Sequence, residues 1–195
     1  MCKVENMCKY ILFVIFLITG CGMEGKSNLP VKSKLPEVSL KDFNENEFIF
    51  SDLKGNIIIL SYIYTNCPDI CHLTSSKLNV FKNSLSKEVK ENLYFVSISF
   101  DPDRDSPAIL REHARLMNLD LENWFFITGN QLNVKKVLEA AGIDPLVKSG
   151  PDSKSYTYSH RDRISLVDKD GQIRMHYKGT NFDEAQLSHD IQTLL

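Results

Sequence analysis

Residues 57–71 (IIILSYIYTNCPDIC) decide the fold of this chain, because a strand and the start of a helix meet within them. Residues 57–64 are almost all β-branched, aliphatic or aromatic and show no polar alternation. This pattern is typical of a strand buried on both faces of a sheet. Pro68 follows Cys67, and proline is favoured at the first helical position, where a missing N–H costs no hydrogen bond. The stretch therefore predicts a buried strand, a turn and a helix that opens at Cys67 and Pro68.

Further strands and helices alternate downstream of this unit, which predicts parallel βαβ units. A turn signal at Asp168-Lys169-Asp170-Gly171 predicts a closing hairpin, and a short hairpin is also expected near the N-terminus. We therefore predict an α/β fold, a mixed sheet flanked by helices with an added N-terminal β-hairpin. Residues 142–159 show little periodicity, and so long a loop is typically functional or mobile. Strands are expected at 38–40, 47–50, 94–100, 124–127, 164–167 and 173–177, and helices at 67–89, 107–118, 133–141 and 187–194.

The composition is that of one ordinary globular domain. The chain has 195 residues, 43% of them apolar and 25% charged, with a formal net charge of −2. These values exclude collagen-like, coiled-coil and low-complexity proteins. They also argue against nucleic acid as a partner, because phosphate binding requires a surplus of Lys and Arg, and 23 basic against 25 acidic residues provide none.

The N-terminus predicts export. Residues 10–18 (YILFVIFLI) are an apolar run that is too short for a membrane-spanning helix, which needs about 20 residues, but fits the core of a secretory signal. Ile18-Thr19-Gly20-Cys21 resembles a bacterial lipobox, although Leu17 stands one place earlier than usual. The resemblance implies a lipid on Cys21 that anchors the chain on the outer side of the cytoplasmic membrane, in the bacterial cell envelope. An uncleaved N-terminal anchor is the alternative.

The five cysteines therefore belong to parts of the chain with different fates. We predict a signal peptide at residues 1–20, which carries away Cys2 and Cys8, a polar tether at 21–36, and a folded domain at 37–195. With Cys21 acylated, Cys67 and Cys71 are the only thiol pair of the exported domain.

Cys67 and Cys71 are spaced so that both sulfurs would lie on one helix face, about 40° apart around the axis and with Cα atoms about 6 Å apart. That separation permits a disulfide and also lets two thiolates bind one soft metal ion. At the N-cap, Cys67 would have its pKa lowered by the helix dipole. The alternatives are a purely structural disulfide or simply two buried thiols, but a bridge over so short a loop stabilises little.

The third candidate ligand must be sought among five histidines. His113, His176 and His189 are expected at the surface or at a sheet edge. His72 follows Cys71 directly but points about 100° away from it around the helix. His160 ends the long loop and precedes a strand, so it is weakly preferred as the residue that lies over the cysteines.

Three motifs in order resemble the Sco/SenC copper-binding family. They are residues 64–71 (YTNCPDIC), residues 96–107 (VSISFDPDRDSP), and Ser159-His160 ahead of a strand and an Asp-x-x-Gly turn. The match covers roughly residues 37–195. The resemblance implies a thioredoxin-like fold with an added N-terminal hairpin, and one copper, Cu(I) or Cu(II), bound by Cys67, Cys71 and His160.

The same resemblance implies a membrane-tethered copper chaperone that helps to assemble the binuclear copper site of cytochrome c oxidase. Its partner would be the copper-bearing oxidase subunit or another copper or thiol protein. The competing function is an enzyme, a thiol-disulfide oxidoreductase that cycles Cys67 and Cys71 between dithiol and disulfide. A peroxiredoxin-like peroxidase is disfavoured, because Tyr64 stands where such enzymes usually have threonine.

The sequence departs from the family in places. His72 replaces the usual proline after the second cysteine and raises the question of an additional nitrogen ligand. The segment before His160, residues 156–159 (YTYS), also differs from the usual pattern. In the second motif, Ser106 and Pro107 are explained as a helix start. Asp103 and Asp105 are candidates for residues that do not bind the metal themselves but orient His160.

Overall fold

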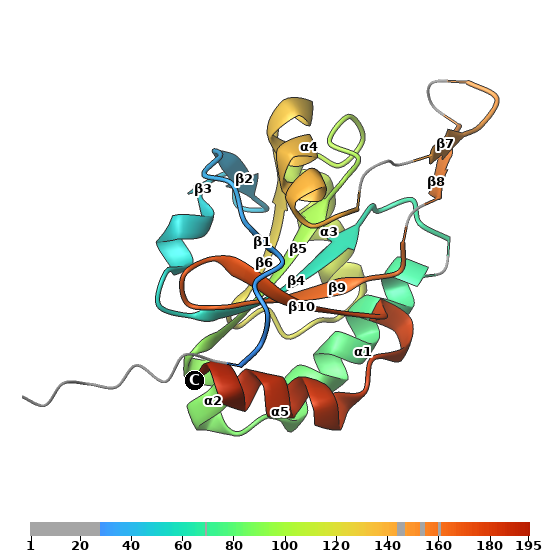
Figure 1. Cartoon of the computed structure of the whole chain (residues 1–195). Coiled ribbons are helices and arrows are strands. Elements are labelled where there is room, and N and C mark those ends of the chain that lie inside the picture. Colours follow the sequence, from blue (N-terminus) through green and yellow to red (C-terminus); the bar gives the residue numbers. More distant parts are fainter. Residues whose placement is uncertain (1–27, 69, 144–146, 153–154, 160) are drawn as a thin grey trace, which may run out of the picture.

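An eight-stranded sheet forms the centre of the domain, with helices on both of its sides (Figure 1). The computed structural model describes residues 28–68, 70–143, 147–152, 155–159 and 161–195. The strand order is β1-β10-β9-β4-β5-β6-β2-β3. Its strands are β1 (Ser33–Lys34), β2 (Leu40–Asp42), β3 (Glu47–Phe48), β4 (Ile57–Ile63), β5 (Leu93–Ser99), β6 (Trp124–Thr128), β9 (Ile164–Val167) and β10 (Gln172–Tyr177).

The three central strands confirm the prediction of parallel βαβ units. Strand β4 pairs in parallel with β5 from Ile57 opposite Leu93 to Ile63 opposite Ser99, and β5 pairs in parallel with β6. All seven residues of β4 are buried. Strands β9 and β10 form the predicted closing hairpin, and β9 runs antiparallel to β4. The predicted α/β mixed sheet is therefore correct.

The helices follow the strands as expected, with one difference. They are α1 (Ile70–Ser84), α2 (Lys87–Glu91), α3 (Pro107–Leu116), α4 (Gln131–Ala140) and α5 (Glu184–Leu194), with short 3-10 turns η1 (Phe50–Leu53) and η2 (Gly179–Asn181). Ser106 caps α3 by accepting a 3.4 Å hydrogen bond from the Ile109 N–H, as its motif predicts. The single helix expected at 67–89 is wrong, because Ser86 caps a separate helix α2 by accepting from the Val89 N–H.

The N-terminal part of the domain contains the predicted hairpin and one further strand. Strands β2 and β3 pair antiparallel, and β2 also extends the sheet beside β6. Residues 33–34, within the segment predicted as tether, form β1 against β10, and Leu35 is buried. The Arg174 guanidinium adds a hydrogen bond from Nε to the Leu29 carbonyl at 3.0 Å. The chain therefore joins the folded domain before residue 37.

Described residues of the long stretch at 142–159 form a second sheet. Strands β7 (Val147–Ser149) and β8 (Thr157–Ser159) pair antiparallel, and this hairpin projects from the body of the domain (Figure 1). Helices α1 and α5 lie together on one side of the main sheet, and α4 lies on the other (Figure 1).

The predicted signal segment and Cys21 lie outside the described residues. Across the part of the chain that is described, no helix combines the length and the apolar character needed to cross a membrane.

Candidate functional site

Cys67 and Cys71 lie together where β4 gives way to α1. Both side chains are buried, with 6% and 2% exposure, and both are thiols rather than a disulfide. Cys67 does not occupy the predicted N-cap, because the described part of the helix begins three residues later at Ile70. Its sulfur instead accepts a 3.4 Å hydrogen bond from the Cys71 N–H in the first turn. The Cys67 side chain therefore lies against the first turn of α1, next to Cys71.

The environment of the thiols favours a protonated Cys71. A hydrogen bond with the Cys67 side chain is the main cause that raises the pKa of Cys71, and burial raises it further. A metal ion that binds the pair displaces the thiol protons. Formation of a disulfide between the two sulfurs also removes them. The pair can therefore bind a thiophilic ion or form a disulfide.

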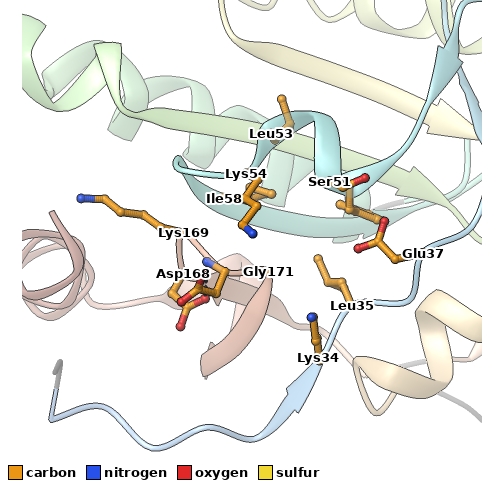
Figure 2. A pocket seen from close by; sticks show the side chains of 12 residues that line it. Lys34, Leu35, Glu37, Ser51, Leu53, Lys54, Ile58, Asp168, Lys169 and Gly171 are labelled. Atoms are coloured by element: carbon orange, nitrogen blue, oxygen red, sulfur yellow. Dashed lines mark hydrogen bonds between the residues drawn. The ribbon is translucent and has the colours of Figure 1, made fainter. Parts of the chain in front are cut away.

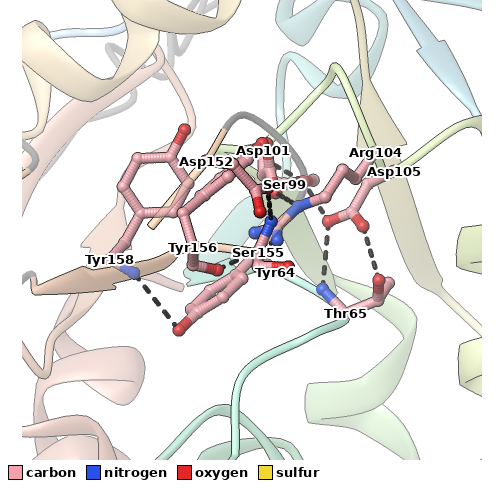
Figure 3. A network of polar contacts seen from close by, with 10 residues as sticks. All are labelled: Tyr64, Thr65, Ser99, Asp101, Arg104, Asp105, Asp152, Ser155, Tyr156 and Tyr158. Atoms are coloured by element: carbon pink, nitrogen blue, oxygen red, sulfur yellow. Dashed lines mark hydrogen bonds and ion pairs between the residues drawn. The ribbon is translucent and has the colours of Figure 1, made fainter. Parts of the chain in front are cut away.

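Asp105 fixes the turn that carries Cys67. Its carboxylate accepts hydrogen bonds from the Thr65 N–H at 3.0 Å and the Thr65 hydroxyl at 2.5 Å, and another from the Ser99 hydroxyl at 2.5 Å (Figure 3). Burial raises the pKa of Asp105, although the hydrogen bonds from Ser99 and Thr65 oppose this effect. The residue thus joins the ends of β4 and β5 next to the thiols. Asp103, the other acidic candidate, is exposed.

A second network ties the β7–β8 hairpin to the end of β5. The Tyr156 hydroxyl donates to Asp101 Oδ1 at 2.6 Å, and Arg104 forms an ion pair with Asp101 through Nε. Arg104 also donates to the Tyr156 carbonyl at 3.0 Å, and its guanidinium carbon lies 3.5 Å from the centre of the Tyr156 ring. Figure 3 shows these side chains gathered around Tyr64. The segment that leads to His160 is therefore anchored on the motif residues 101–104.

Aromatic rings fill the space between this network and the cysteine turn. Tyr64, directly after β4, packs against Phe100 and Tyr158 with centroid distances of 5.1 and 5.6 Å. The Tyr64 hydroxyl also accepts a hydrogen bond from the Tyr158 N–H at 3.4 Å. Tyr64 thus connects the cysteine turn to the hairpin. This role of Tyr64 was not predicted from the sequence, although the aromatic alternation of Tyr156 and Tyr158 is a signal for it.

One histidine, His113, differs from its predicted position. His113 is buried at 7% exposure, so its prediction as a surface residue is wrong. It lies one turn from Leu110 and next to Ala114, which are both buried, and this helical spacing was the signal for burial. His189 is exposed, and His176 is partly buried, with Nδ1 at 2.9 Å from the Ser165 hydroxyl.

His160 itself lies outside the described residues, so the structure does not place the third predicted ligand. In the described ranges, no three or more His, Cys, Asp or Glu side chains form a group that could hold a metal ion. The two cysteines are brought together, and Tyr158 anchors the segment before His160 to Tyr64, three residues before Cys67.

A small pocket of about 140 Å³ lies away from the cysteines. It is formed by the β1 segment, η1 and the turn between β9 and β10 (Figure 2). Its lining is mainly lysine, acidic and aliphatic side chains, among them Lys34, Glu37, Lys54 and Lys169. Neither thiol reaches it, so we assign the candidate site to the cysteine turn.

A pair of buried thiols between a strand and its helix, in a mixed sheet of this topology, defines a thioredoxin-like protein with a thiol site. The sequence matches the SCO1/SenC family over residues 30–195. This chain belongs to the SCO1/SenC family.

Individual relatives agree with this assignment. A candidate copper-binding protein of Stutzerimonas stutzeri is 32% identical over 150 residues, which cover 77% of this chain and 72% of the relative. Copper-bound yeast Sco1 superposes with a TM-score of 0.69 at 29% identity and covers 84% of this chain and 91% of its own. Copper-bound ScoI of Bradyrhizobium japonicum has a TM-score of 0.72 at 22% identity, with coverages of 84% and 100%. The full-length mitochondrial SCO1 of yeast is longer, and the chain spans 48% of it.

Proposed function

We propose that this protein binds one copper ion through Cys67, Cys71 and His160 and delivers it during assembly of the binuclear copper site of cytochrome c oxidase. The observation that carries the proposal is the convergence of two buried thiols, with the Cys71 N–H 3.4 Å from the Cys67 sulfur. Thiolates are soft donors that suit Cu(I), and an imidazole added to them can also hold Cu(II).

The donor set fits a transferred ion better than a structural one. A structural zinc site normally has four protein ligands, whereas two sulfurs and one nitrogen leave the coordination incomplete. An open position lets a ligand of the receiving protein attack the ion before the donor ligands leave. Copper-bound yeast Sco1, at 29% identity, supports copper as the ion.

The chain's own residues have separate tasks in this function. Cys67 and Cys71 bind the ion and release their protons to solvent as it enters. Asp105 holds the backbone of Thr65, two residues before Cys67, by a 3.0 Å hydrogen bond and so limits the movement of the turn. Arg104, Asp101 and Tyr156 hold the hairpin that leads to His160.

Copper titration of the reduced full-length protein tests the proposal. We expect one equivalent of Cu(II) to give a sulfur-to-copper charge-transfer band, and this band to disappear in His160→Ala while the fold persists. The matched control is His189→Ala, which removes an exposed imidazole and should leave the band unchanged. Native protein that binds no stoichiometric copper would refute the proposal.

A thiol-disulfide oxidoreductase is the second candidate, and the hydrogen-bonded dithiol supports it as well. In this reaction both thiols lose their protons and together two electrons, one sulfur–sulfur bond forms between Cys67 and Cys71, and the disulfide of a substrate is cleaved to two thiols. Turnover of a disulfide substrate that is unchanged by His160→Ala would favour this function, since a dithiol reductase does not need the histidine.

We also propose that the chain is exported and held on the outer side of the cytoplasmic membrane by a lipid on Cys21. The support is the apolar run at residues 10–18 and the lipobox-like Ile18-Thr19-Gly20-Cys21. Mass spectrometry of the protein purified from membranes should find an acylated N-terminal cysteine at position 21. Cys21→Ala should abolish this mass, whereas Cys8→Ala should not, and a chain that retains residues 1–20 would contradict lipid anchoring.

A further inference from the structure

The imidazoles of His72 and His113 face each other beside the dithiol. His72 lies in the first turn of α1, directly after Cys71, and His113 lies in α3. Their ring centroids are 5.3 Å apart, and the ring planes are inclined by 39°. Helices α1 and α3 cross between parallel neighbouring strands in the same direction, so they lie on one face of the sheet and bring the two rings together.

His113 is enclosed in a way that leaves one of its nitrogens unused. The side chain is 7% exposed, and its Nε2 atom is buried without a hydrogen-bond partner among the described residues. A buried polar atom without a partner is unfavourable, because it has lost its hydrogen bonds to water. The ring is closed off on another side by Phe126 of β6, with centroids 6.1 Å apart. Nε2 of His113 is therefore available to a ligand.

The separation of the rings suits a metal ion between them. Imidazole nitrogens bind first-row ions at about 2.0–2.1 Å, so two rings on one ion have centroids about 5–6 Å apart. The observed 5.3 Å falls in this range. Imidazole nitrogen is a preferred donor for copper. The two rings therefore already have the spacing of a ligand pair.

We propose that His72 and His113 form a second copper-binding site, distinct from Cys67, Cys71 and His160, that takes Cu(II) through two imidazole nitrogens. The proposal rests on copper being the ion that this protein carries. With only two protein ligands, the site keeps positions open for water or for a ligand of a donor protein. Since His72 is bonded to Cys71 in the chain, an ion held there would be next to the dithiol, as a point of entry requires.

The test removes the proposed dithiol site and asks whether copper still binds. In full-length protein with Cys67→Ser, Cys71→Ser and His160→Gln, we expect one equivalent of Cu(II), with nitrogen hyperfine structure in the electron paramagnetic resonance spectrum. Adding His72→Gln should weaken binding by about tenfold or more, since loss of an outer-shell partner alone costs about 10–100-fold. The same loss is expected for His113→Gln. His189→Gln, which removes an exposed imidazole, is the control and should change nothing.

The outcomes separate this proposal from the function above. Equal binding with and without His72→Gln would overturn the second site and leave the dithiol site intact. If the native protein binds copper through nitrogen alone, with the same affinity as the variant that lacks both cysteines and His160, the dithiol site is overturned and this one is supported. Should His113→Gln fail to fold by circular dichroism, His72→Gln decides, because His72 is only partly buried.

Discussion

Asp105 holds Thr65 by two hydrogen bonds, one of 3.0 Å from the backbone N–H and one of 2.5 Å from the hydroxyl. The two residues are 40 positions apart in the chain and join the ends of neighbouring strands. Because Cys67 follows Thr65 by two positions, this contact fixes the turn that places the thiols.

Removal of the Asp105 carboxylate should therefore destabilise the protein. In Asp105→Ala the Thr65 N–H loses its acceptor in a partly buried place, and we expect the free energy of unfolding to fall by about 2–4 kcal/mol. Urea denaturation followed by circular dichroism measures this change. The control, Asp103→Ala, alters an exposed carboxylate and should stay within about 0.5 kcal/mol. Equal unfolding midpoints for the two variants would contradict the role of Asp105.

The Tyr156 hydroxyl should control the order of the hairpin before His160. Tyr156→Phe removes the 2.6 Å hydrogen bond to Asp101 but keeps the ring under Arg104. We expect amide hydrogen exchange in residues 155–159 to accelerate, with a loss of about 1–2 kcal/mol in local stability. Tyr94→Phe, at the opposite end of β5, is the matched control. Unchanged exchange in this segment would show that the hydroxyl does not anchor the hairpin.

His176 should make the protein sensitive to acid. Burial, followed by the charges of Arg163 and Lys32, lowers the pKa of His176 to about 4. In the unfolded chain the pKa of His176 is about 6.5. Below that pH the unfolded state therefore binds a proton that the folded state does not bind until the pH approaches 4. This contribution to stability is present above about pH 6.5 and is lost as the pH falls towards 4.

We expect this loss to be about 1–2 kcal/mol after allowance for partial exposure. His176→Gln should flatten the decline in the free energy of unfolding between pH 6.5 and about 4, as measured by urea titrations at several pH values. His189→Gln, which changes an exposed histidine, should preserve the decline. A native protein whose stability is constant over this interval would refute the assignment.

The sequence predicted the parts of this protein that depend on local pattern. Neighbouring residues alone indicate the buried strand β4, the capped start of α3 and the hairpin turn at Gly171. The contacts that join distant segments could not be predicted in this way. Tyr156 meets Asp101 across 55 positions, and Asp105 meets Thr65 across 40.

The positions of the histidines also depend on contacts between distant segments. His113 has the helical spacing of a core residue, but a polar side chain in that position was assigned to the surface. Only the placement of α3 beside α1 brings it to His72. For His160, the sequence motif remains the sole guide, because the residue lies outside the described part of the chain.

The ligand set of the bound copper tests the central proposal most directly. X-ray absorption spectroscopy of the full-length protein loaded with one equivalent of copper counts the sulfur and nitrogen atoms around the ion. We predict two sulfur ligands and one imidazole nitrogen, with the nitrogen lost in His160→Ala and one sulfur lost in Cys71→Ser. A copper shell without sulfur in the native, reduced protein would contradict the account.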